Sequence, residues 1–278
     1  MNEFLCNNFS FCRGRKTFIM GILNVTPDSF SDGGKYNSLN EALRHTESML
    51  EEGADIIDIG AVSTRPFSVA VDEDEEWSRL EKILKEIKKN FNVCVSVDTV
   101  SPAVAEKSLA LGVDIINDVS GVFLTEMAEI IKKYNCGWVL MHGGIGVRRA
   151  EEIVSFENGI VEDVNAFFSD IVKKATDFGI SAKRLCLDAG FGFSKTEEQN
   201  IELLKNYEKL DSGSCLSLCA LSRKRFISTL SGEDDSQRLM GTVSANLTAV
   251  MKGADLIRVH DVAAHRKALN AIDKLIKY

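Results

Sequence analysis

Eight short apolar runs alternate with segments of helical spacing, and this alternation limits the possible folds more than any other feature. Each run predicts a buried strand, because strands covered on both faces are continuously apolar. We predict strands at residues 18–23, 54–60, 93–98, 114–117, 138–141, 185–188, 215–220 and 255–259. We predict helices at residues 38–52, 74–90, 101–111, 125–134, 157–178, 197–207, 236–252 and 262–276.

The same short phrase precedes three of these strands: Gly53-Ala54-Asp55, Gly112-Val113-Asp114 and Gly253-Ala254-Asp255. A repeated strand–helix unit with right-handed crossovers closes into a (β/α)₈ barrel. The main alternative, an open doubly wound sheet, usually carries a glycine-rich nucleotide fingerprint after its first strand. That fingerprint is missing here. We therefore predict an α/β protein, a single-domain TIM barrel over residues 1–278, with a short N-terminal hairpin at residues 1–17.

Composition and charge argue against several classes of protein. The net charge of -8 disfavours a general binder of nucleic acid or of anionic membranes, although it permits an anionic substrate. No run approaches the roughly 20 apolar residues of a membrane span, and the N-terminus has no apolar signal core. We therefore expect a cytoplasmic protein. The seven cysteines include no CxxC pair, so we expect buried thiols rather than disulfides or zinc ligands.

Polar side chains gather where the predicted strands end. In a barrel of this kind, function is located at the carboxyl ends of the strands. Seven of the eight strands place a charged or amide side chain at or just past that end, whereas chance surface polarity would fall on both ends. The residues are Asn24, Ser63-Thr64-Arg65, Asp98, Asn117, Met141-His142, Asp188, Ser222-Arg223-Lys224, Arg258 and His260.

These side chains suit two kinds of ligand. One group suits a flat heterocycle, since a carboxylate can accept two parallel N–H bonds from a 2-aminopyrimidinone edge. Its members are Asp98, Asn117, Asp188 and Lys224. The other group suits an oxyanion such as a phosphate. Its members are Arg65, Arg258 and His260, with Asn24 nearby. A magnesium ion bound through Asn24 and the phosphates would need no protein cage.

Several of these residues also have simpler interpretations. Asp98 and Asp188 could be helix N-caps. His142 is expected to be structural and Arg223 to form a surface ion pair, while the acidic run at residues 72–76 is expected to be a solvated helix start.

A set of motifs then identifies a family. The motifs ILNVTPDSFSDGG, STRP, SVDT, IND, MH, DAGFGFSK, SRK and RVHDV occur here in the order and spacing of the dihydropteroate synthases. The chain resembles that family over nearly its whole length. The resemblance implies condensation of 6-hydroxymethyl-7,8-dihydropterin diphosphate with p-aminobenzoate, giving 7,8-dihydropteroate and diphosphate. It also implies a step of folate synthesis, a target of sulfonamides, a Mg²⁺ requirement and a homodimer.

The resemblance also implies a role for each matched residue. The pterin-binding residues would be Asp98, Asn117, Met141, Asp188, Phe193 and Lys224. The diphosphate-binding residues would be Asn24, Thr64, Arg65, Arg258 and His260, with Asn24 as the metal ligand. The p-aminobenzoate residues would be Phe30, Thr64, Arg65, Pro66, Phe67 and Ser222. The catalytic residues would be Arg65, Lys224, Arg258 and His260.

Three positions depart from the family pattern. Phe67 replaces the usual glycine after STRP, Ala189 replaces proline after Asp188, and Ala220-Leu221 precede the SRK serine in place of a glycine-containing segment. We expect Phe67 to reshape the p-aminobenzoate pocket and to weaken sulfonamide binding. Two alternatives remain open from sequence: a pterin-binding paralogue without synthase activity, and a pterin-dependent methyltransferase-type barrel. A scaffold barrel is disfavoured by the one-sided polar clustering.

Overall fold

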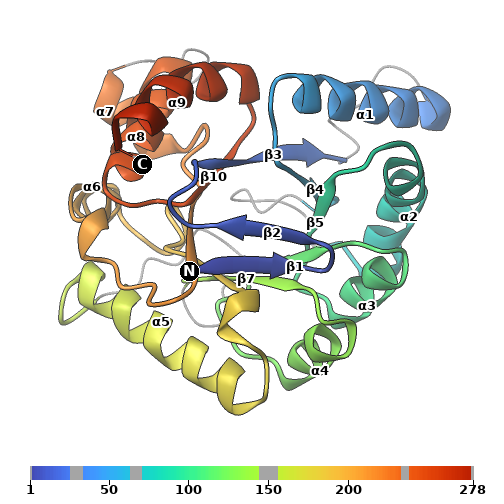
Figure 1. Cartoon of the computed structure of the whole chain (residues 1–278), viewed down its shortest axis with the longest axis horizontal. Coiled ribbons are helices and arrows are strands. Elements are labelled where there is room, and N and C mark those ends of the chain that lie inside the picture. Colours follow the sequence, from blue (N-terminus) through green and yellow to red (C-terminus); the bar gives the residue numbers. More distant parts are fainter. Residues whose placement is uncertain (1, 26–33, 63–70, 144–155, 233–237, 277–278) are drawn as a thin grey trace.

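A closed barrel of eight parallel strands, ringed by helices, forms the body of the protein (Figure 1). The computed structural model describes residues 2–25, 34–62, 71–143, 156–232 and 238–276. The strand order around the barrel is β10-β3-β4-β5-β6-β7-β8-β9. The predicted TIM barrel and N-terminal hairpin are therefore confirmed.

The strands lie close to their predicted positions. Their bounds are β3 Phe18–Asn24, β4 Ile56–Gly60, β5 Cys94–Asp98, β6 Ile115–Asp118, β7 Gly137–Met141, β8 Leu185–Asp188, β9 Leu216–Cys219 and β10 Leu256–Val259. The α-helices are α1 Gly34–Glu51, α2 Glu73–Asn90, α3 Pro102–Ala110, α4 Thr125–Tyr134, α5 Ile160–Asp177, α6 Glu197–Lys205, α7 Arg225–Ser231, α8 Leu239–Met251 and α9 Val262–Ile276. Two 3₁₀ turns, Ala182–Arg184 and Tyr207–Lys209, precede β8 and follow α6.

Helix bounds account for most of the differences from the sequence prediction. Helix α1 begins four residues before residue 38. Helix α5 begins only at Ile160, because Gly159 has a φ of +94° and cannot belong to the helix. Helix α7 was not predicted. It has seven residues, too few for a periodic pattern, and it ends at Gly232 in the left-handed conformation.

The aspartates of the recurring phrase fix the starts of three strands. Each is preceded by a left-handed glycine, and each carboxylate accepts a backbone N–H from the neighbouring strand. For Asp55, Asp114 and Asp255 the donors are Ile19, Val95 and Ser217, at N···O distances of 2.9, 2.9 and 3.0 Å. Each carboxylate also pairs with one or more basic side chains. The phrase therefore stabilises the amino end of the barrel, the end where this fold keeps its structural residues.

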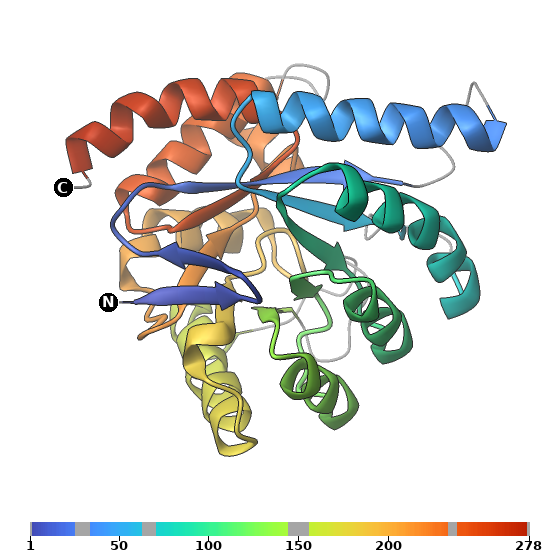
Figure 2. The same cartoon turned by 45° about the vertical axis from the view of Figure 1, so that its right-hand side comes forward.

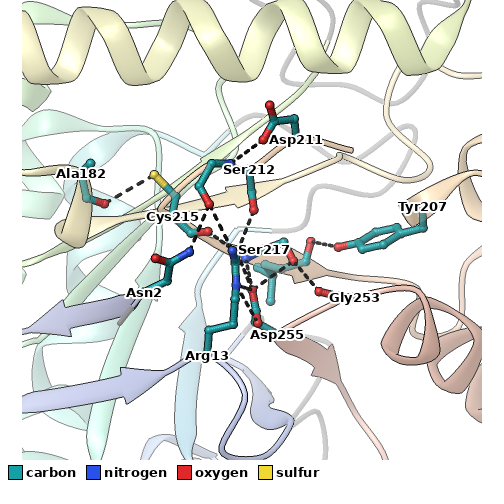
Figure 3. A network of polar contacts seen from close by, with 12 residues as sticks. Asn2, Arg13, Ala182, Tyr207, Asp211, Ser212, Cys215, Ser217, Gly253 and Asp255 are labelled. Atoms are coloured by element: carbon teal, nitrogen blue, oxygen red, sulfur yellow. Dashed lines mark hydrogen bonds and ion pairs between the residues drawn. The ribbon is translucent and has the colours of Figure 1, made fainter. Parts of the chain in front are cut away.

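The N-terminal hairpin closes that same end. Strands β1 Glu3–Cys6 and β2 Phe9–Cys12 pair antiparallel and lie across the strand starts (Figures 1 and 2). Phe4, Cys6 and Phe11 are buried against the apolar residues that fill the barrel interior. Figure 3 shows how Arg13 fastens the hairpin, donating to the Asp255 carboxylate and to the Ser212 hydroxyl. The hairpin is thus a plug that is held in place by an ion pair.

The interior contains two apolar clusters, and polar residues lie at the carboxyl ends of the strands. One cluster lies between the barrel and its helices, and the other fills the lumen near the strand starts. Side chains alternate in direction along each strand, so Cys94, Ser96 and Asp98 of β5 share one face. Cys94 belongs to the lumen cluster, whereas Asp98 lies four residues farther toward the carboxyl end.

Two further expectations can be compared with this structure. All seven cysteines are free thiols, and six of them are buried, as the sequence predicted. Among the described residues, no helix combines the length and apolarity that a membrane span requires.

Candidate active site

An arginine joined to two carboxylates lies at the centre of the polar end of the barrel. Arg258 of β10 donates from Nε to Oδ2 of Asp58 at 2.6 Å and from Nη2 to Oδ2 of Asp98 at 2.8 Å. Asp58 is fully buried, while 11% of the Asp98 side chain is exposed. Asp58 also accepts a bond from the Asn117 amide nitrogen at 3.3 Å. Residues predicted for the heterocycle and for the oxyanion are thus brought into one network.

The Asp98 carboxyl group is held in an environment that disfavours its charge. Burial raises the pKa of Asp98 from 3.8 to about 7, and this effect exceeds the opposing attraction of the Arg258 guanidinium. The neighbouring Asp58 raises it further. A buried carboxyl group in this state gains from any ligand that brings N–H donors to it.

Asp188 and Lys224 form a second part of the site. Oδ1 of Asp188 accepts the backbone N–H of Gly190 at 2.8 Å, so the turn after β8 is held without the proline that Ala189 replaces. Burial raises the pKa of Asp188, and nearby Lys224 opposes that shift. Burial also lowers the pKa of Lys224 to about 8, with Asp188 acting in the opposite direction.

Phe193 and Met141 add apolar surface to this part. The Lys224 ammonium lies 4.8 Å from the centroid of the Phe193 ring and donates to the backbone oxygen of Phe191. Met141, at the end of β7, is 2% exposed. A pair of opposite charges beside an aromatic ring suits a flat, polar heterocycle.

Neither Asp98 nor Asp188 is a helix N-cap, so that alternative is wrong. Ser101 caps α3 by accepting the N–H of Val104, and Thr196 caps α6 through a reciprocal pair of bonds with Gln199. Both aspartates therefore direct their carboxylates to other partners, the arginine and the turn described above.

His260 and Ser222 form the third part. The Ser222 oxygen lies 2.9 Å from Nδ1 of His260 and accepts the backbone N–H of the same residue at 3.2 Å. A hydroxyl that donates to Nδ1 leaves the ring proton on Nε2, the nitrogen that can then donate to an anion. Ser222 was predicted to meet a p-aminobenzoate carboxylate, which stays a prediction; in this structure its hydroxyl contacts His260.

Asn24 ends β3 beside Gly60. A Cβ placed on Gly60 would lie 3.9 Å from the Asn24 side-chain oxygen and 3.9 Å from Oδ2 of Asp98. Glycine at this position keeps the space between the two open. Within the described parts of the chain, no three acidic, histidine or cysteine side chains form a group that could hold a metal ion. The amide oxygen of Asn24 still fits a magnesium ion that takes its other ligands from phosphate and water.

Five predicted site residues lie outside the described part of the chain. They are Phe30, Thr64, Arg65, Pro66 and Phe67. The structure therefore brings together the pterin set and the Asn24, Arg258 and His260 part of the anion set.

Sequence reasoning missed two buried charged residues. Asp58 stands between isoleucines within a strand, and a carboxylate inside an apolar run was the signal that could have identified it. The Lys195 ammonium donates to three backbone oxygens, those of His142, Gly190 and Phe193, at 3.2, 2.9 and 3.2 Å. Burial lowers the pKa of Lys195 to about 7, against the attraction of Asp188. Lys195 thereby ties the loop after β8 to the end of β7.

The simpler interpretations hold for two of the remaining residues. His142 is buried and its Nε2 lies 2.8 Å from the Asp163 carboxylate on α5, a structural contact. Arg223 pairs with Asp261 and remains 53% exposed. The acidic run is exposed apart from its last member, Glu76, which is buried on the inner face of α2.

Comparison with known proteins places the chain in a family. Residues 20–260 match the family described as pterin binding enzyme, so the barrel and its polar mouth define a pterin-binding protein. The dihydropteroate synthase of Clostridium beijerinckii is 39% identical over 95% of this chain and 96% of its own length. The chain thus belongs to the pterin-binding enzymes and, within them, to the dihydropteroate synthases, transferases of folate synthesis.

Solved structures agree with this assignment. Dihydropteroate synthase from Clostridium difficile, determined in the presence of pteroic acid, superposes with a TM-score of 0.90 at 38% identity, covering 96% of this chain and all of that one. The enzyme from Xanthomonas albilineans, determined with 4-aminobenzoic acid, gives a TM-score of 0.90 at 35% identity, covering 99% and 98%.

Proposed function

We propose that this site condenses 6-hydroxymethyl-7,8-dihydropterin diphosphate with p-aminobenzoate, releasing diphosphate and forming 7,8-dihydropteroate. The observation that carries the proposal is the Arg258 bridge, which joins the heterocycle residues to the anion residues at one end of the barrel. A substrate with a pterin ring and a diphosphate would occupy both sets at once. Relatives solved with pteroic acid and with 4-aminobenzoic acid support the same chemistry.

The pterin would lie among Asp98, Asn117, Asp188 and Lys224. Its ring N–H groups would donate to the two aspartates, whose buried carboxylates gain from such donors. The Lys224 ammonium would donate to the ring carbonyl. Met141 and Phe193 would pack against the ring faces. Pterin binding thus replaces water with fixed dipoles around a flat ligand.

The diphosphate would be bound by Arg258 and His260, with Asn24 beside them. Thr64 and Arg65 belong to this subsite by sequence. Bound through the Asn24 oxygen, a magnesium ion would neutralise charge on the diphosphate. The protein's own contribution would be the guanidinium fork of Arg258 and a proton on Nε2 of His260, the tautomer that a Ser222 hydroxyl donating to Nδ1 would favour.

The reaction needs no covalent nucleophile from the protein. The bond between the pterin methylene carbon and the diphosphate oxygen breaks, and its electron pair leaves with the diphosphate. The amine nitrogen of p-aminobenzoate then bonds to that carbon and loses a proton. Arg65, Arg258, His260 and Lys224 act by stabilising the departing charge and by holding the reactants in line.

The second substrate would bind at the outer edge of the site. Among the described residues, Ser222 is the one assigned to p-aminobenzoate. The sequence motifs assign Phe30, Pro66 and Phe67 to the same subsite. Phe67, in place of a small residue, would narrow the pocket and weaken sulfonamide binding more than p-aminobenzoate binding. Comparing the inhibitor-to-substrate affinity ratio of wild type and Phe67→Gly tests this role, and an unchanged ratio would count against it.

We also propose a homodimer formed through the helices near the C-terminus. Leu239, Met240 and Met251 of α8 are 40%, 64% and 63% exposed, an unusual concentration of apolar surface on one helix. Met240→Glu should then lower the mass measured by light scattering to that of one chain. Seven free thiols fit a reducing compartment, and we place the enzyme in the cytoplasm.

A turnover assay tests the proposed reaction directly. Purified protein would be mixed with magnesium, pterin diphosphate and p-aminobenzoate, and dihydropteroate and diphosphate would be measured. Lys224→Ala, which removes one pterin donor, is the control. Product that disappears in the variant supports the proposal. Diphosphate-dependent pterin binding without product would instead indicate a paralogue that binds pterin and lacks synthase activity.

A further inference from the structure

Asp58 lies deeper in the barrel than Asp98, the carboxylate assigned to the pterin ring. It is the third residue of β4, in register with Ser96 of β5, while Asp98 pairs with Gly60 nearer the mouth. Its side chain has no exposed surface, whereas that of Asp98 is partly exposed. A ligand that enters from the mouth therefore meets Asp98 first and leaves Asp58 covered.

The two carboxylates bind different nitrogens of Arg258. Asp58 accepts from Nε, at the base of the guanidinium, and Asp98 accepts from the terminal Nη2. These two bonds can be broken separately. If an N–H of the pterin ring donates to the Asp98 carboxylate in place of Nη2, Nη2 loses its partner while the bond from Nε to Asp58 persists. The terminal nitrogens would then be available to the diphosphate of the same substrate.

Asp58 also orients the side-chain amide of Asn117, one of the residues proposed to bind the pterin. Its Oδ2 accepts from the Nδ2 atom of Asn117, so the amide oxygen of Asn117 is the end that remains for a ligand. Its other oxygen, Oδ1, is buried and has no hydrogen-bond partner among the residues that the structure describes. The stable position of Asp58 thus depends on the two side chains that it orients.

We propose that Asp58 is a positioning residue that anchors Arg258 while Asp98 exchanges this arginine for the pterin ring. The inference rests on the proposed function. In the ligand-free site the Asp98 carboxylate accepts a hydrogen bond from Arg258, where it would accept one from the pterin ring N–H in the complex. Pterin binding releases the outer side of the guanidinium, and Asp58 keeps it oriented toward the diphosphate. Recognition of the ring and of the diphosphate is coupled in this way.

Asp58→Asn tests the anchor because it keeps the shape of the side chain and removes its charge. Binding would be measured with two probes, pterin diphosphate and the pterin alcohol that lacks diphosphate. We expect the affinity for pterin diphosphate to fall about tenfold and the affinity for the alcohol to fall about threefold or less. The KM for p-aminobenzoate should stay within about twofold of wild type, a split that mere loss of stability would not produce.

Two further variants sharpen the test. Ser96→Ala is the matched control, since Ser96 is equally buried beside Asp58 and its hydroxyl has no partner within the described residues. It should bind both probes as wild type does. Arg258→Gln provides a double-mutant cycle, and in that background Asp58→Asn should cost less than about twofold, because its effect passes through the arginine. Asp58→Ser replaces Asp58→Asn should the latter fail to fold.

The outcomes separate this proposal from the proposed function. Equal losses for both probes, unchanged binding of pterin diphosphate, or a full tenfold loss in the Arg258→Gln background would overturn the anchoring role. Wild-type protein that binds neither probe would overturn the proposed function and this inference together. If wild type binds both probes and Asp58→Asn loses affinity mainly for pterin diphosphate, the result supports both the proposed function and the anchoring role.

Discussion

Replacing Asp98 with asparagine should stabilise the ligand-free protein and abolish its activity. Burial raises the pKa of this carboxyl group from 3.8 in a free side chain to about 7 in the fold. Between these values the folded state holds a proton that the unfolded state has released, so stability falls as the pH rises through this window. The full shift corresponds to about 4 kcal/mol above pH 7. Asparagine removes this cost, and its oxygen still accepts from Arg258.

The measurement is urea-induced unfolding of both proteins without ligand, at pH 5 and pH 8. We expect Asp98→Asn to raise the free energy of unfolding by about 2 to 4 kcal/mol at pH 8, allowing for relaxation around the charge, and by less than half of that at pH 5. Turnover should be lost at both values. A variant that is less stable than wild type at pH 8, or a gain that does not change with pH, would show that the ion pair with Arg258 outweighs burial.

The same substitution at the other end of the barrel is the control. Asp255 is 3% exposed, pairs with Arg13 and accepts the backbone N–H of Ser217. Asp255→Asn keeps the shape and removes the charge, so we expect a loss of about 2 to 3 kcal/mol. The KM values for both substrates should not change, because none of the described residues proposed to bind substrate lies at this end of the barrel.

Three further substitutions test the packing around the site and the plug. Gly137→Ala should cost about 1 to 3 kcal/mol in urea unfolding with turnover preserved, because the new Cβ would lie 2.8 Å from Phe4 Cζ. Gly190→Ala should abolish pterin binding measured by calorimetry, since its Cβ would lie 1.7 Å from the His142 backbone oxygen. Lys195→Met should raise the KM for pterin diphosphate about tenfold, because the backbone oxygens of His142 and Phe193 lose the Lys195 donor and that of Gly190 keeps only the N–H of Phe193.

The barrel could be predicted from sequence because its signal is repeated. Each barrel strand has at least two apolar residues in four to seven, and each long helix contains several turns of periodic pattern. The short helix α7 lacks such a pattern, and its bounds depend on tertiary packing and on the left-handed Gly232. The Gly-x-Asp phrase was visible from the sequence, but its purpose was not, since the N–H groups that the carboxylates accept belong to other strands.

The sequence predicted which residues gather at the candidate site, but it predicted few of the contacts between them. Residues at the strand ends share a position that the barrel rule identifies, so the sequence could place Asp98, Asn117 and Asp188 at one end of the barrel. Asp58 was not found, because it lies inside a strand and its importance comes from Arg258, 200 residues away. Ser222 was given a substrate role, whereas its hydroxyl contact with His260 depends on a distance that no sequence pattern contains.

The N-terminal hairpin at the amino end of the barrel affects the charged groups at the carboxyl end, because both border the same apolar cluster. Phe4 and Phe11 complete an apolar cluster that fills the lumen from the strand starts. The charged groups above this cluster are therefore shielded from water on one side, and burial is the largest cause of the raised pKa of Asp98 and of the lowered pKa of Lys224. A site shielded in this way binds a flat polar ring strongly, because the ring supplies the partners that water would otherwise provide.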